Sequence, residues 1–581
     1  MLLKLSALPK LPKLPDSSRT DAVLSGILSA GILLLTLLLN RKHLDFQSNI
    51  PVLSLDLLLA ASFCFFICRV MLKAFRSHSF FRVLLAVFCW GVLFSMPVLI
   101  SYSGNDTDWV YSFTHETWKE QCASGRPFCG ILLDTVISFG MLRPAVINTV
   151  SLLSILFLSM SLTLLHDQLC RAAGSDAPFR RHMVCAGLCL LVWNPFSMEF
   201  LGFNNYIFCH YFFLGVIILA LYMPLRFRNR RGIAGSLVLL CMSGCGYQPS
   251  LAVYALLGPP VFCFAFPSTG KSGWRSRLGA AVLPGIFSGT ALCFSALSMH
   301  LLVRLLNLQL GVRTSGKADI AANLQTLYEQ LPHYCRDSFG FFPDYGLFFI
   351  TLCLLILFLL NLRNLRWGAG ETLGIALISA IGLWVYSIGF QILLPAPNYY
   401  AARSVFACAG VPGFLLMLLF LLKKDFRTES PRFQQTAWAL LALFACILLY
   451  HTHKMSAVLH ERDGQDRIIG EQIFCQIEKL EAQHKTRVTE LVVCRDAVWR
   501  ETYPEADRNY GFWAAKLFSV PWKLELYFPA FHNRNFKIDF RIWRPQDEEV
   551  RKIVRGRNWD RLSAEEQVVW LGGGRCAVIS Y

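Results

Sequence analysis

The chain has 581 residues, of which 55% are hydrophobic and only 16% are charged. Soluble proteins carry roughly 25% charged residues, so this composition excludes an ordinary soluble enzyme and a disordered chain, and indicates a polytopic membrane protein. The net charge of +17 would suit a nucleic-acid-binding protein. Lys and Arg instead occur in short clusters between apolar runs, as membrane topology requires, so we expect no nucleic-acid partner.

Apolar runs of the length needed to cross a bilayer, about 20 residues, occur along most of the chain. We predict spans near residues 22–40, 52–72, 83–102, 146–166, 183–200, 205–223, 233–247, 250–266, 278–306, 346–362, 372–394, 404–422 and 434–450. With the N-terminus in the cytoplasm, the inward segments carry roughly three times as many basic residues as the outer loops. This bias predicts an all-α bundle of about 13 transmembrane helices at 1–450, with the tail outside.

Two long outer loops, 103–145 and 307–345, interrupt the series of spans. Loops of this length in compact domains are often functional. In the first loop, Asp134 and Arg143 interrupt the apolar stretch 129–145, which favours a helix on the membrane surface over a further span. Cys122 and Cys129 share this loop, and an oxidising compartment would permit a disulfide between them.

The tail, residues 451–581, has a mixed and charged composition. The segment 461–484 has an apolar helical face, and 487–494, 523–528 and 535–543 are rich in β-branched and aromatic residues, which predicts strands. We expect a small α/β domain outside the membrane. A packing module without chemistry is an equal alternative.

Asp106 and Asp108 follow the third predicted span, at the outer membrane surface. Two carboxylates at this spacing can share a divalent cation such as Mg²⁺ or Mn²⁺, or supply a general base. The simpler alternative is a solvated acidic loop.

Four arginines, Arg126, Arg143, Arg336 and Arg403, lie at the outer side, against the topological bias. An anionic lipid headgroup would explain them, and a guanidinium can bind phosphate bidentately. Snorkelling toward lipid headgroups without catalysis is the alternative for each of them.

Polar residues also occur at the ends of spans 5 to 7. Glu199 and His210 fall at or inside apolar segments, where ionisable groups are expensive and often functional. Tyr247 and Gln248 follow span 7, and the two side chains could bind sugar hydroxyls or simply cap helices. The segment AFPSTGKS at 265–272 has Ala265 where a P-loop needs Gly, so it is no nucleotide site.

Several short motifs occur in a familiar order: NDTDW at 105–109, SGRPF at 124–128, WNPFSMEFLGFNNY at 193–206, GYQPSL at 246–251 and NYYAAR at 398–403. In this layout the chain resembles the type II serotype-converting O-antigen glucosyltransferases of bacteria and phages. The acidic pair appears here as Asp106-Thr107-Asp108, and the two spans before residue 83 are an extra pair relative to the single span expected before it.

The resemblance implies a GT-C-like membrane glycosyltransferase of the bacterial inner membrane with a periplasmic tail. Its donor would be undecaprenyl-phosphate glucose and its acceptor lipid-linked O-antigen or another surface glycan. Asp106 or Asp108 would act as base, Arg403, Arg126, Arg143 and Arg336 would bind the donor phosphate, and Tyr247, Gln248 and Glu199 would bind sugar.

The main alternative is a transporter or flippase of lipid-linked sugars, which would favour mid-membrane polar groups and repeat symmetry. We detect little of either in the sequence. Transfer of an acetyl or phosphoethanolamine group onto cell-wall glycans is a third hypothesis, but no nucleophile–base constellation or metal cluster supports it.

Overall fold

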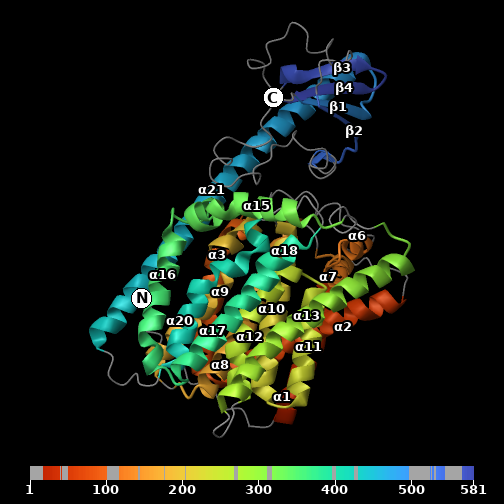
Figure 1. Ribbon diagram of the computed structural model, residues 1–581. Helices are drawn as coiled ribbons and strands as arrows, with labels where there is room; N and C mark the ends of the chain where they lie inside the picture. Colours follow the sequence, from red (N-terminus) through yellow and green to blue (C-terminus); the bar gives the residue numbers. More distant parts are fainter. Residues whose placement is uncertain are drawn as a thin grey trace.

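The structure is a computed structural model that consists of a helical bundle and a small sheet beyond one end of it (Figure 1). It describes residues 18–39, 41, 50–100, 117–141, 144–175, 177–202, 204–266, 273–309, 317–394, 401–423, 430–495, 524, 527–528, 532–542 and 565–580.

Each predicted span coincides with one helix or with a short series of consecutive helices; the span at 372–394, for example, consists of α17 (Ala369–Trp384), η7 (Val385–Gly389) and α18 (Phe390–Ile392). The bundle contains α1 (Ser18–Leu39), α2 (Ile50–Arg76), α3 (His78–Phe94), α4 (Met96–Ile100), α8 (Pro144–Ala172), α9 (Pro178–Val192), η2 (Pro195–Gly202), α10 (Asn204–Phe227), α11 (Arg230–Gly244), η3 (Gln248–Ser250), α12 (Leu251–Ala265), α13 (Gly273–Leu305), α16 (Gly346–Asn361), α17 (Ala369–Trp384), α18 (Phe390–Ile392), η8 (Ala402–Ser404), α19 (Phe406–Ala409), α20 (Val411–Leu422) and α21 (Pro431–His484).

Nine helices in the described part of the chain are long and apolar enough to cross a membrane, or ten if α9 and η2, which are bent by 53°, form one span. At the three remaining predicted spans the helices α3, α11 and α20 are shorter. The prediction of a polytopic helical bundle is therefore confirmed, but the number of about 13 full spans is not.

The loop segments also contain helices. α6 (Thr117–Ala123) and α7 (Pro127–Ser138) come from the first long loop, and α15 (Ile320–Pro332), η4 (His333–Asp337) and η5 (Ser338–Gly340) from the second. α6 and α15 lie at the end of the bundle nearest the sheet, which we call the sheet end (Figure 1). α7 is buried along most of its length rather than on one face only.

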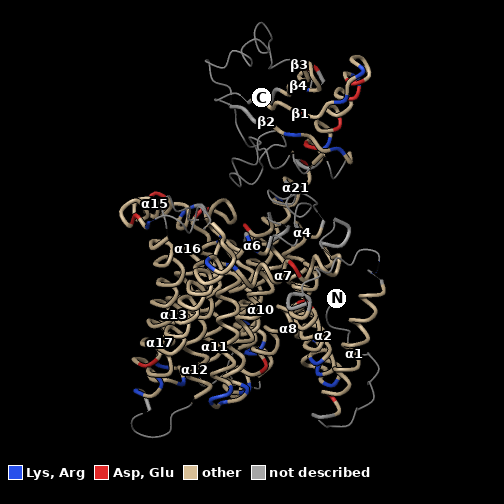
Figure 2. Tube along the Cα trace, turned by 90° about the vertical axis from the view of Figure 1, so that its right-hand side faces the viewer, with Lys and Arg blue, Asp and Glu red and all other residues tan. Residues whose placement is uncertain are grey.

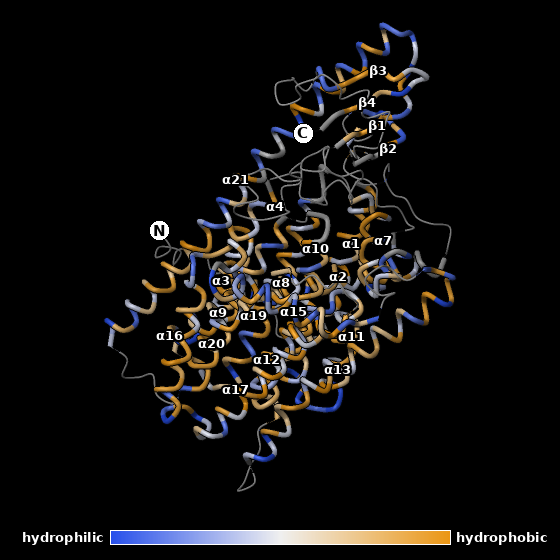
Figure 3. Tube along the Cα trace, turned by 45° about the horizontal axis from the view of Figure 1, so that its top comes forward, coloured by the Kyte–Doolittle hydropathy of each residue, from blue (hydrophilic) through white to orange (hydrophobic). Residues whose placement is uncertain are grey.

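Lys and Arg gather at the opposite end of the bundle, which we call the basic end (Figure 2). α21 is largely polar where it leaves the bundle toward the sheet (Figure 3). It continues without a break across residues 450 and 451, where we placed the domain boundary. The change of composition there occurs within one helix of 54 residues.

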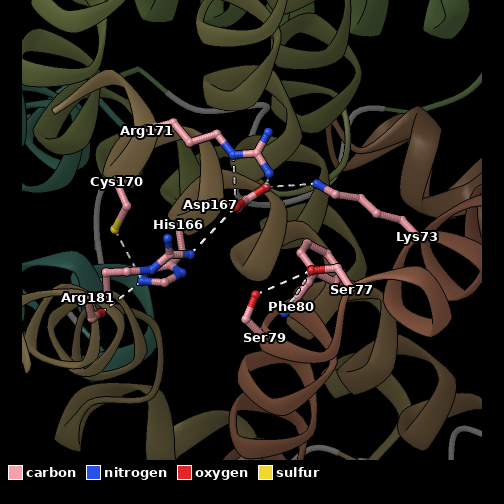
Figure 4. A network of polar contacts seen from close by, with 9 residues as sticks. All are labelled: Lys73, Ser77, Ser79, Phe80, His166, Asp167, Cys170, Arg171 and Arg181. Atoms are coloured by element: carbon pink, nitrogen blue, oxygen red, sulfur yellow. Dashed lines mark hydrogen bonds and ion pairs between the residues drawn. The ribbon is translucent and has the colours of Figure 1, made fainter. Parts of the chain in front are cut away.

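Ion pairs join helices that lie far apart in the sequence, and one such network centres on Asp167 (Figure 4). The buried Asp167 of α8 accepts hydrogen bonds from Lys73 of α2 at 2.9 Å and Arg171 at 3.2 Å, and Arg181 of α9 lies 3.7 Å away. Nearby, Arg277 of α13 bonds Glu371 of α17 at 2.9 Å.

The sheet has the strand order β2-β1-β4-β3, formed by β1 (Glu490–Arg495), β2 (Lys537–Ile542), β3 (Val568–Gly572) and β4 (Arg575–Ser580). β1 is parallel to both β2 and β4, and β3 and β4 are antiparallel. The apolar face of α21, with Ile473 and Ile477, packs against its core. This confirms the predicted α/β tail, the helix at 461–484 and two of the strands.

The strand predicted at 523–528 is wrong. Its described residues, Leu524, Tyr527 and Phe528, are helical and buried. Their spacing of three and four residues places them on one helical face, and the aromatic content of the segment, from which the strand was predicted, is equally compatible with a buried helix.

Candidate active site

The predicted site residues fall into two groups. Asp106, Asp108 and Arg143 lie outside the described residues, so their roles stay predictions. Arg126, Glu199, Tyr247, Gln248 and Arg403 are described, and the structure brings all five together at the sheet end of the bundle.

Glu199 and Arg403 form a buried ion pair. Glu199 lies on η2, with a side chain that is 3% exposed, and Arg403 lies on η8, with a side chain that is 20% exposed. One carboxylate oxygen accepts from Nη1 of Arg403 and the other from its backbone amide. These two hydrogen bonds, one to the backbone and one to the side chain, fix the position of the guanidinium of Arg403.

Tyr247 holds the backbone of the same arginine. Its hydroxyl donates to the carbonyl oxygen of Arg403 at 3.0 Å. Glu199 thus binds the backbone amide and guanidinium of Arg403, and Tyr247 binds its backbone carbonyl. Arg403 follows residues 395–400 closely in the sequence.

Gln248 fixes the loop before α7. Its Nε2 donates to the carbonyl oxygen of Gly125 at 2.6 Å. Gly125 has a φ of +77°, and a Cβ there would lie 3.2 Å from the sulfur of Met299, so glycine suits this position. Gln248 therefore sets the position of the next residue, Arg126.

Arg126 occupies the N-cap position of α7 without a side-chain capping bond and lies over the ring of Tyr247, with the guanidinium carbon 5.5 Å from the ring centroid. Its Nε is buried and has no hydrogen-bond partner in the described part of the chain. No carboxylate among the described residues pairs with it. Of the site cations, Arg126 is therefore the one best prepared to receive an anion.

A buried carboxylate holds α7 itself in place. Asp56 of α2 accepts hydrogen bonds from the hydroxyls of Thr135 and Ser138, both at 2.9 Å. Asp56 is 2% exposed and Asp134 beside it 3%. Sequence reasoning missed Asp56, although an aspartate inside an apolar run is a recognisable signal.

His210 of α10 adjoins the cluster. Its ring is 2% exposed, stacks on Phe200 with centroids 3.5 Å apart and meets the ring of Tyr247 edge-on. Neither ring nitrogen has a hydrogen-bond partner among the described residues. Its aromatic enclosure indicates a packing role between η2, α10 and Tyr247.

Two further predictions receive less support. Arg336 lies on η4 with an exposed side chain, and the described contacts do not place it in the cluster. Cys122 and Cys129 are both buried free thiols, so the structure does not contain the disulfide considered between them. Cys129 packs in the same apolar cluster as Cys209 of α10, which gives it a different neighbour.

Metal binding stays a prediction. The described residues contain no group of three or more His, Cys, Asp or Glu side chains able to hold an ion, and the predicted ligands Asp106 and Asp108 lie outside them.

A comparison with known protein families connects this cluster to a reaction class. The family model described as glucosyl transferase GtrII matches residues 111–422, more than half of the chain. The matched part contains all five clustered residues, whereas Asp106 and Asp108 lie just before it. No curated protein and no solved structure matches the chain. The family match confirms the resemblance drawn from the sequence motifs, and the chain belongs to the GtrII glucosyl transferase family.

Proposed function

We propose that the protein transfers glucose from undecaprenyl-phosphate glucose to lipid-linked O-antigen or another surface glycan, at the sheet end of the bundle. This end would face the periplasm, with the protein in the bacterial inner membrane and its N-terminus in the cytoplasm. The family favours transfer over the alternative of a flippase.

The observation that carries this proposal is the position of Arg126. Its guanidinium, for which the described residues supply no anionic partner, lies over the ring of Tyr247, which bonds Arg403 of the Glu199–Arg403 pair. Charged groups inside a membrane protein are costly unless an anion compensates them. The donor phosphate supplies that anion, and the polyprenyl chain stays in the bilayer.

In the proposed reaction, Asp108 or Asp106 takes the proton of the acceptor hydroxyl, with or without a divalent cation at the pair. The hydroxyl oxygen attacks the anomeric carbon, and the bond from that carbon to the phosphate oxygen breaks. The departing polyprenyl phosphate gains a second negative charge. Arg126 and Arg403 stabilise this charge, and Arg143 and Arg336 are further candidates for it.

Glu199, Tyr247 and Gln248 take a positioning role in this proposal rather than the direct sugar contact expected from the sequence. The hydroxyl of Tyr247 donates to the backbone of Arg403, and the amide of Gln248 donates to Gly125. These bonds position Arg403 and Arg126 before the donor binds. Donor binding therefore loses less conformational entropy.

The test is the Arg126→Gln variant, assayed in nanodiscs with undecaprenyl-phosphate glucose labelled in the sugar. Loss of a charge-assisted hydrogen bond of about 1.5–3 kcal/mol lowers kcat/KM for the donor roughly 10- to 150-fold. The matched control is Arg304→Gln, because Arg304 is exposed in the last turn of α13 at the same end. Equal kinetics in the two variants would contradict the assignment.

A further inference from the structure

An apolar groove lies between α3, α9 and α21, and none of the Arg126 cluster residues lines it. Its volume is about 270 Å³. Its walls are almost entirely hydrocarbon and sulfur, and include Val83, Val87, Cys189, Leu190, Leu441 and Ala445. All three helices begin at the basic end, so the groove runs from that end toward the middle of the bundle.

The mouth of the groove is basic and aromatic. Arg82 and His182 lie in the second turn of α3 and α9, and Trp438 lies two turns into α21. The rings of His182 and Trp438 are 5.8 Å apart, and Phe179 stands against Trp438 at 6.4 Å. Tryptophan and basic side chains at one depth are typical of the membrane–water interface.

Arg82 has no carboxylate partner in the described part of the chain. It differs in this from Lys73, Arg171 and Arg181, which share Asp167. An anion from outside the protein can therefore approach it without competing with an internal ion pair.

Trp90 lies deeper in the groove and forms part of its wall. It follows Arg82 by eight positions, or about 12 Å along the helix axis. An occupant with an anionic group at Arg82 would therefore place a hydrocarbon chain against Trp90.

We propose that the groove binds one anionic phospholipid from the leaflet at the basic end, with its headgroup at Arg82 and His182 and an acyl chain along the groove. The lipid would fill the gap between α21 and the rest of the bundle. Because α21 continues into the sheet, a bound lipid would fix the direction in which that helix leaves the membrane.

The test uses native mass spectrometry of the full chain in detergent, titrated with phosphatidylglycerol or phosphatidylcholine. One phosphatidylglycerol should bind more tightly than phosphatidylcholine. Arg82→Gln should weaken it about fivefold, as expected for one basic residue near a membrane surface. Ala186→Phe, which fills the groove and keeps Arg82, should also weaken it. Arg363→Gln is the control, because Arg363 is exposed at the same end and outside the groove.

Three results would overturn the proposal. Equal affinity for the two lipids would show that charge does not determine binding. Equal losses of phosphatidylglycerol affinity in the Arg82→Gln and Arg363→Gln variants would show that binding is not specific to the groove. Displacement of phosphatidylglycerol by undecaprenyl phosphate at much lower concentration would make the groove a polyprenyl site instead. Lipid binding is measured without glucose transfer, so failure here leaves the proposed reaction untouched.

Discussion

Glu199→Gln removes the negative charge from the buried pair and leaves Arg403 in place. Removing one partner of a buried ion pair typically costs about 3–5 kcal/mol. Arg403 is 20% exposed, so water offsets part of the loss and we expect about 3 kcal/mol. The side-chain oxygen of the introduced glutamine can still accept a hydrogen bond, but the glutamine carries no charge to hold the guanidinium of Arg403.

The assay combines unfolding of the purified protein in SDS with transfer kinetics. Glu371→Gln is the matched control, because it breaks the Arg277 pair at the other end of the bundle, where the side chains are 26% and 11% exposed. Both variants should be destabilised, but only Glu199→Gln should raise KM for the donor or lower kcat. Donor kinetics that match those of Glu371→Gln would refute the positioning role of Glu199.

Three further predictions concern other parts of the chain. Asp108→Asn should reduce transfer about 10²- to 10⁴-fold while the protein still accumulates in the membrane, and normal transfer would exclude it as the base. Gly413→Ala should destabilise the α9–α20 contact by about 1–3 kcal/mol, since a Cβ there would lie 2.5 Å from the carbonyl oxygen of Gly187. Gly279→Ala, inside α13 with open space around it, should instead be stabilising by up to about 1 kcal/mol in the same SDS unfolding assay. Burial would raise the pKa of Glu481, but hydrogen bonds from Arg534 and a backbone amide lower it overall. Its stabilising contribution is therefore present above the pKa of an unfolded glutamate, about 4.3, and is lost as the pH falls through the lower folded value. Proteolysis of the tail should become faster in the wild type as the pH falls through this range. In Glu481→Gln its rate should not change with pH over the same range.

The sequence predicted the helical bundle well because apolar runs and basic clusters record where a chain meets lipid and water. It could not predict the pairing of Glu199 with Arg403, which are 204 residues apart and meet only when η2 and η8 pack together. The sequence overestimated the number of full spans because an apolar run can also form a short helix that packs inside the protein. α20, with 12 residues, is such a helix.

The sequence placed several site residues near one another, but it did not reveal which groups their side chains contact. Arg126, Tyr247 and Gln248 were expected at the same side of the membrane from their places in the chain, and they do lie together at one end of the bundle. The sugar-binding role expected for Tyr247 and Gln248 rested on residue type alone. Their backbone partners depend on a turn at Gly125 that no periodicity reveals.

The most direct test of the proposed reaction uses purified protein in nanodiscs with labelled undecaprenyl-phosphate glucose and lipid-linked O-antigen, with and without EDTA. We predict label in the glycan for the wild type, strongly reduced label for Arg126→Gln and Asp108→Asn, and wild-type amounts for Arg304→Gln. Movement of the labelled lipid between leaflets without any transfer to glycan would contradict the account and favour a flippase.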